Sequence, residues 1–156
     1  MNIREIKPNE MTLLSDFLYE AIFQRDADNP LPRIVIQIPS LWIYIDSFGQ
    51  SKGDHCLVAE VDSFIVGAVW VRNIHAFGYV SEGVPELAIS VYSQYRGKGI
   101  GTMLLQEMTI FLRDKGYEHI SLSVQRDNPA VRLYQRLGFN VLREDGDELI
   151  LWLDIL

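Results

Sequence analysis

The stretch 96-RGKGIG-101 places three glycines and two basic side chains within six residues. An apolar run, 87-LAISV-91, comes before it, and a helical pattern of apolar residues comes after it. The first turn of a helix carries unpaired backbone N–H groups and a partial positive charge, and glycines let a ligand approach the backbone closely. This combination predicts a turn that binds phosphate.

The spacing of the glycines excludes two common phosphate-binding turns. The dinucleotide-binding pattern Gly-x-Gly-x-x-Gly would need its third glycine where the chain has Thr102. A nucleotide-binding P-loop would need Ser or Thr after its lysine, but Gly99 follows Lys98. The pattern that remains is Arg-x-x-Gly-x-Gly, formed by Arg96, Gly99 and Gly101.

Two longer motifs, 86-ELAISVYSQYRGKGIGTMLLQEM-108 and 128-NPAVRLYQRLGF-139, resemble the acetyl-CoA-binding core of the GNAT superfamily of N-acetyltransferases. They have the order and spacing of that family, and the expected strands and helices resemble it over nearly the whole chain. The resemblance implies acetyl-CoA as cofactor, coenzyme A as product, and direct attack by a primary amine in a ternary complex. It also implies that backbone N–H groups bind the coenzyme A pyrophosphate along Arg96, Gly97, Lys98, Gly99, Ile100, Gly101 and Thr102.

The strand before the turn and the second motif supply the other expected contacts. The resemblance implies that Ile89, Ser90 and Val91 pair with the pantetheine arm, whose amides can hydrogen-bond to a strand edge as a peptide does. Asn128 is expected to cap the helix that begins at Pro129 and, in the family, to orient the cofactor. A glycine turn that only connects packed elements is the alternative interpretation of the first motif.

Acetyl transfer from a thioester to an amine needs a neutral amine, a hydrogen-bond donor for the carbonyl oxygen as it gains charge, and a proton for the departing thiolate. The resemblance places Tyr134 near the thioester sulfur as the acid, and a phenol with a pKa of about 10 keeps its proton at neutral pH. A tyrosine on the apolar face of a helix is otherwise a core residue. The backbone N–H of Val91 is the expected donor to the carbonyl oxygen.

The base is predicted to be Glu86, which begins the strand that should line the thioester. Glu82, Asp46, Asp26 and water are its rivals, and a solvated carboxylate at the end of a strand is the alternative interpretation of Glu86. Some relatives carry a glutamate on the next strand, where this chain has Ser123.

Hydrophobic periodicity predicts one α/β domain over residues 1–156, with helices on both faces of a mixed sheet. The resemblance implies the GNAT arrangement, with about six or seven strands. The expected strands are residues 2–7, 55–61, 64–72, 86–91, 118–124, 139–143 and 148–154. The expected helices are residues 10–23, 41–48 and 100–115, and the segment from Pro129 to Gly138.

Charge and composition narrow the expected partners. The formal net charge is −7 at pH 7, and no expected face carries a cluster of Lys and Arg, which argues against nucleic acid and weakly favours a cationic substrate. No apolar run is long enough to span a membrane, and residues 1–10 lack the apolar segment of a secretion signal. The single cysteine, Cys56, indicates a cytoplasmic setting, and the scattered His55, His75 and His119 predict no metal site.

The acceptor site is expected to come from the first two helices and the loop from Asn73 to Pro85. Aromatic and acidic residues in and near these segments suit an organic cation. They are Trp42, Tyr44, Phe48, Trp70, Phe77, Tyr79, Asp26, Asp28 and Asp46.

The identity of the acceptor stays open among a small amine, an antibiotic, an amino acid and a protein amino group. Two other functions also stay open: an acyl-CoA-binding sensor or regulatory domain without transfer, and a transferase of a longer acyl group. The edges of the final strands are compatible with a homodimer.

Overall fold

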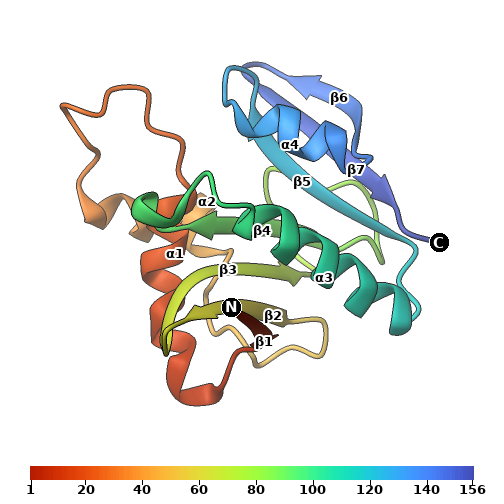
Figure 1. Ribbon diagram of the computed structural model, residues 1–156. Coiled ribbons are helices and arrows are strands. Elements are labelled where there is room, and N and C mark those ends of the chain that lie inside the picture. The colour runs from red at the N-terminus through yellow and green to blue at the C-terminus, as the bar shows by residue number, and fades with distance from the viewer.

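A mixed β-sheet forms the centre of the protein, as the computed structural model of residues 1–156 shows (Figure 1). Its strands are β1 (Asn2–Glu5), β2 (His55–Val61), β3 (Phe64–Arg72), β4 (Glu86–Val91), β5 (His119–Gln125), β6 (Asn140–Asp145) and β7 (Glu148–Asp154). They lie in the order β1-β2-β3-β4-β5-β7-β6, and all neighbours are antiparallel except β4 and β5. The predicted mixed sheet is therefore confirmed.

Helices cover both faces of this sheet, as the sequence predicted (Figure 1). The long helix α3 (Ile100–Asp114) and the short α4 (Ala130–Arg136) pack on one face. α1 (Leu14–Ala21) packs on the other, together with the turns that follow the short α2 (Pro39–Trp42). Alternate residues of β2 belong to the two different apolar clusters, because successive side chains of a strand point to opposite faces. None of the helices has the length and apolar character that crossing a membrane requires.

The N-terminal helix is shorter than the predicted residues 10–23. A 3-10 helix over Pro8–Leu13 comes first, and α1 follows it. The carboxylate of Glu10 accepts the N–H of Lys7 at 2.8 Å and pairs with Arg4 of β1 at 2.7 Å. These contacts tie the turn to the sheet, so a tertiary contact sets where the α-helix begins.

The predicted helix over residues 41–48 is also too long. α2 ends at Trp42, and the chain continues as turns. The side chain of Arg72 in β3 donates to the carbonyl oxygens of Ile43 and Asp46, at 2.9 Å each. Because the sheet supplies these partners, the carbonyl groups of this segment do not need a continuing helix.

A buried ion pair joins β3 to the turns that follow α2. Arg72 donates to both carboxylate oxygens of Asp54, at 3.0 and 3.1 Å, and the two side chains are only 8% and 1% exposed. We expect Asp54→Ala to lower the free energy of unfolding by about 3–5 kcal/mol, because the buried guanidinium loses its partner. Urea denaturation measures this loss. The control Asp114→Ala removes an exposed carboxylate from α3 and should change stability by less than about 0.5 kcal/mol. Equal stability of the two variants would contradict the prediction.

Candidate active site

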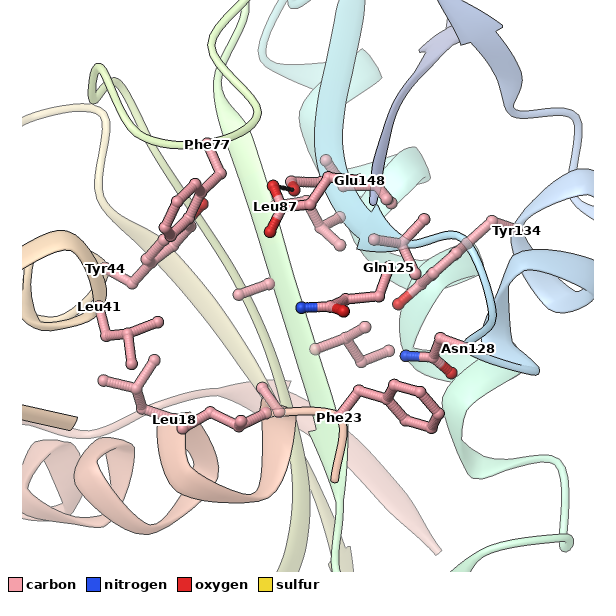
Figure 2. A pocket seen from close by; sticks show the side chains of 17 residues that line it. Leu18, Phe23, Leu41, Tyr44, Phe77, Leu87, Gln125, Asn128, Tyr134 and Glu148 are labelled. Carbon is pink, nitrogen blue, oxygen red and sulfur yellow. Dashed lines mark hydrogen bonds between the residues drawn. The ribbon is translucent and has the colours of Figure 1, made fainter. Parts of the chain in front are cut away.

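The sheet opens between its two parallel strands. β4 and β5 share one residue pair, Glu86 with Ser121, and then diverge (Figure 1). A cavity of about 160 Å³ lies between the diverging strands and the helices α1 and α2 (Figure 2). Residues 87–89 of β4 and 122–125 of β5 line it. We call it the small cavity.

A second cavity, of about 730 Å³, continues from the small one and is called the large cavity. Ile89, Asn128 and Tyr134 line both cavities. The large cavity extends along the end of β4 as far as Arg96, beside the predicted phosphate-binding turn. Residues from both sequence motifs therefore surround one continuous opening, and Tyr134 lies where its two parts meet.

The glycine turn has the backbone geometry that a bound anion needs. Gly97 and Gly99 adopt φ angles of 74° and 82°, in the left-handed region that favours glycine. Nothing lies within 4 Å of the position that a Cβ would take on either residue, so the space beside the backbone is open. α3 begins directly afterwards at Ile100, and its first N–H groups have no partner inside the helix. The turn therefore fits a phosphate group.

The two basic side chains of this turn have contacts of their own. Arg96 donates through Nε to the Val91 carbonyl at 2.9 Å and pairs with Glu20 at 3.2 Å. The Lys98 ammonium lies 5.5 Å from the centre of the Tyr95 ring. Arg96 is thus held by contacts within the protein, while the backbone of the turn is open to an anion.

The edge of β4 that faces β5 is free along the opening. Tyr92 donates its N–H to the Val66 carbonyl of β3 at 2.9 Å. Successive N–H groups of a strand point to opposite edges, so those of Val91 and Ile89 point toward the opening. Ser90 instead holds β4 against α1, because its hydroxyl donates to a carbonyl oxygen of α1 at 2.6 Å.

Tyr134 and Asn128 lie at the junction of the two cavities, and Figure 2 shows Tyr134 pointing into the opening. Tyr134 is 9% exposed, and burial is the only influence that shifts its pKa, which rises to about 12. Its hydroxyl therefore keeps its proton at neutral pH. The side-chain oxygen of Asn128 accepts the N–H of Ala130 at 2.9 Å and so caps the start of α4.

Glu86, the predicted base, is buried at the closed end of the opening. It is 1% exposed, and its carboxylate accepts the N–H groups of Ala76 and Gly78, at 2.9 and 3.0 Å, and the Tyr44 hydroxyl at 3.1 Å. Burial raises the pKa of Glu86, and the three hydrogen bonds oppose that rise. Glu86 lines neither cavity, but Tyr44 lines the small one. The role of Glu86 as base stays a prediction.

The carboxylate that does line the small cavity, Glu148, was missed by the sequence analysis. Glu148 begins β7 opposite Gln125 of β5, and it accepts the Ser123 hydroxyl at 2.7 Å, drawn as a dashed line in Figure 2. The rivals Glu82 and Asp46 line neither cavity, and neither does Asp26. The sequence offered one indication of Glu148, because it is the first residue of an expected strand, as Glu86 is.

Part of the predicted aromatic supply forms the wall of the small cavity that faces Glu148. Tyr44 and Phe77 line this wall, together with Leu41 (Figure 2). Trp70 is a core residue instead, and its Nε1 donates to the Tyr44 carbonyl at 3.0 Å. Tyr44 and Phe77 thus line the cavity, and Trp70 holds Tyr44 in place, whereas Trp42, Phe48 and Tyr79 line neither cavity.

The loop from Asn73 to Pro85 lies directly on β5, and Gly78 is the reason it can. A Cβ on Gly78 would come within 3.0 Å of backbone atoms of Leu122 and Ser123. Since backbone atoms cannot shift cheaply, a side chain at this position would lift the loop. The close approach holds Phe77 at the mouth of the small cavity.

Comparison with known proteins identifies the family of this chain. The model of the acetyltransferase (GNAT) family matches residues 20–139. An N-alpha-acetyltransferase of Sulfurisphaera tokodaii is 37% identical over 109 residues, which cover 60% of this chain and 65% of that protein. A thialysine N-epsilon-acetyltransferase of Mus musculus is 34% identical over 108 residues, which cover 64% of this chain and 63% of that protein. The chain thus spans less than two thirds of the length of these curated relatives.

A solved structure shows the same fold. The PaiA N-acetyltransferase from Thermoplasma acidophilum, in complex with coenzyme A, is similar over 98% of both chains with a TM-score of 0.73. Its sequence is 21% identical to this one, so the likeness concerns the arrangement of strands and helices.

Proposed function

Because the chain belongs to the acetyltransferase (GNAT) family, we propose that it transfers an acetyl group from acetyl-CoA to a primary amine by direct attack, with both substrates bound together. The proposal treats residues 1–156 as one catalytic domain. The observation that carries it is the opening between β4 and β5, where a large cavity beside a phosphate-binding turn meets a small cavity at Tyr134. The large cavity suits a long cofactor that carries phosphate, and the small one suits the acceptor.

The residues around the large cavity fit acetyl-CoA. The backbone from Arg96 to Thr102 would bind the pyrophosphate, because its glycines leave open space at the start of α3. The free N–H groups of Ile89 and Val91 would pair with the pantetheine arm. The likeness to a structure that contains coenzyme A supports this placement. When bound, acetyl-CoA supplies an acetyl group activated as a thioester.

Tyr134 would donate the proton that the leaving thiolate needs. Its hydroxyl stands at the junction of the two cavities and keeps its proton because burial raises its pKa to about 12. A thiolate in the same buried place is also poorly solvated, which raises its affinity for a proton. The Val91 N–H, on the free edge of β4, would donate to the carbonyl oxygen as that oxygen gains negative charge.

Glu86 would act as base through Tyr44. As the amine attacks, its proton would pass to the Tyr44 oxygen while the Tyr44 proton passes to the Glu86 carboxylate, 3.1 Å away. The raised pKa of Glu86 supports this route, because it strengthens the carboxylate as a proton acceptor. Tyr44→Phe removes the relay and should lower kcat while acetyl-CoA binding persists. A Tyr44→Phe variant with the full rate would rule the route out.

Two measurements test the proposed function. Calorimetric titration with acetyl-CoA tests the cofactor, and release of free thiol on addition of primary amines tests the transfer. Binding in the micromolar range followed by amine-dependent thiol release is the expected result. Binding without thiol release from any amine would favour the acyl-CoA sensor instead. Faster release from longer acyl-CoA donors would change the assigned acyl group, and absence of binding would overturn the proposal.

A further inference from the structure

The small cavity is lined by one negatively charged side chain and by no positively charged side chain. Of the 17 residues that line it, 13 are hydrophobic, and Glu148 is the only Asp, Glu, Lys, Arg or His among them. An ammonium group would therefore have one partner of opposite charge in this cavity. A carboxylate would have none, and it would lie close to a like charge.

Glu148 has hydrogen-bonding capacity left for a ligand. Its Oε2 accepts the Ser123 hydroxyl at 2.7 Å, and its Oε1 forms no hydrogen bond with another residue. Figure 2 shows Glu148 extending into the cavity from the side of β5 and β7, with Tyr44 and Phe77 on the far side. Ser123 fixes one oxygen and leaves the other available, which is the arrangement that binds a cation with a defined direction.

The volume and walls of the cavity limit what can be attached to that ammonium. An apolar cavity of about 150 Å³ holds one benzene molecule, and the small cavity measures about 160 Å³. Leu41, Tyr44 and Phe77 form an apolar and aromatic wall facing Glu148. The face of an aromatic ring attracts a cation electrostatically, and it also packs against apolar groups. A flat apolar body of about one ring is therefore the best fit.

We propose that the acceptor is a small primary monoamine that enters as an ammonium paired with Glu148 and whose apolar body, about the size of one aromatic ring, packs against Leu41, Tyr44 and Phe77. The ammonium first passes one proton to the Glu148 carboxylate, and the neutral amine then attacks and releases its second proton by the Tyr44 route. This inference rests on the proposed function and names its substrate class. An amino acid is disfavoured because its carboxylate finds no cation in the cavity. A polyamine gains nothing from its further charges, because the cavity offers a single carboxylate.

Two probes that differ by one carboxylate test the charge requirement. With saturating acetyl-CoA, 2-phenylethylamine should be acetylated with a kcat/KM about 10- to 100-fold above that of L-phenylalanine, the range of one charge-assisted contact. The kcat/KM for spermidine should not exceed that for 2-phenylethylamine. Thiol release gives the rates, and calorimetric titration of 2-phenylethylamine into the protein saturated with coenzyme A gives binding without turnover.

Variants assign the selectivity to Glu148. Glu148→Gln should raise KM and the calorimetric Kd for 2-phenylethylamine by about 10- to 100-fold and leave the Kd for acetyl-CoA unchanged. Glu107→Gln removes the same charge from an exposed site on α3 and should change neither value. If Glu148→Gln does not fold, Phe77→Ala replaces it, because Phe77 is 43% exposed and its loss should spare the fold. Phe77→Ala should weaken the binding of 2-phenylethylamine more than the binding of ethylamine.

The outcomes separate this inference from the proposed function. Equal use of L-phenylalanine, or Glu148→Gln with an unchanged KM for 2-phenylethylamine, overturns the acceptor class while acetyl transfer stands. Absence of acetyl-CoA binding, or of thiol release with every amine, overturns the proposed function itself. Tighter binding of 2-phenylethylamine to the wild type than to Glu148→Gln, together with transfer, supports both.

Discussion

The Tyr134→Phe variant is expected to have a kcat about 100- to 10,000-fold below that of the wild type, the range for loss of general acid catalysis. The Kd for acetyl-CoA should not change. The substitution removes one hydroxyl at the junction of the two cavities and keeps the ring, which packs against Phe139 with a centroid distance of 5.8 Å. Thiol release measures kcat, and calorimetry measures the Kd.

Two controls make this result specific. Tyr117→Phe removes a phenolic hydroxyl from a residue that lines neither cavity, and it should leave kcat unchanged. The pH dependence of the wild type gives the second control. Because the pKa of Tyr134 is about 12, its ionisation should cause no fall in kcat as pH rises from about 7 to about 10. A Tyr134→Phe variant with the wild-type kcat would remove Tyr134 from the mechanism.

The Gly99→Glu variant is expected to bind acetyl-CoA more than about 100-fold more weakly than the wild type. A side chain at this position would enter the open space beside the backbone, where the proposal places the pyrophosphate. Its carboxylate would also repel a phosphate at the start of α3. Calorimetric titration of the wild type and the variant measures the effect.

Gly116→Glu is the matched control for backbone strain and added charge. Gly116 follows the other end of α3, adopts a φ of 90°, and has nothing within 4 Å of its Cβ position, as Gly99 does. Both variants should therefore lose similar stability in thermal unfolding, but only Gly99→Glu should lose the cofactor. Equal loss of binding in the two variants would mean that strain, rather than a blocked phosphate site, explains the result.

Local patterns in the sequence were sufficient to predict the glycine turn that precedes α3. The positive φ angles of Gly97 and Gly99 and the start of α3 at Ile100 depend on residues adjacent in the chain. The hairpin of β2 and β3 is also local, because Asp62 and Ser63 adopt the left-handed conformation that its two-residue turn requires. Structures set by such short-range interactions can be predicted from the spacing of residue types in the sequence.

Interactions between residues far apart in the sequence decided the burial of Glu86 and the position where α2 ends. The sequence placed Glu86 at the start of a strand, but its burial follows from Tyr44, Ala76 and Gly78 folding over it. The helix predicted over residues 41–48 ends at Trp42 in the structure, because Arg72 of β3 donates hydrogen bonds to carbonyl oxygens of the following turns. In both cases tertiary hydrogen bonds outweighed a local tendency that is weak in free energy.

The sequence by itself determined the fold class, the glycine turn before α3 and the position of Tyr134 in its motif, because neighbouring residues encode turns, helix starts and strand alternation. Only the tertiary structure decided that β7 lies beside β5, and this pairing brings Glu148 next to Ser123 in the small cavity. The order of strands in a sheet depends on packing among segments far apart in the chain, and no local spacing records it. The glycine turn could therefore be predicted from the sequence, whereas the lining of the small cavity could be described only from the folded protein.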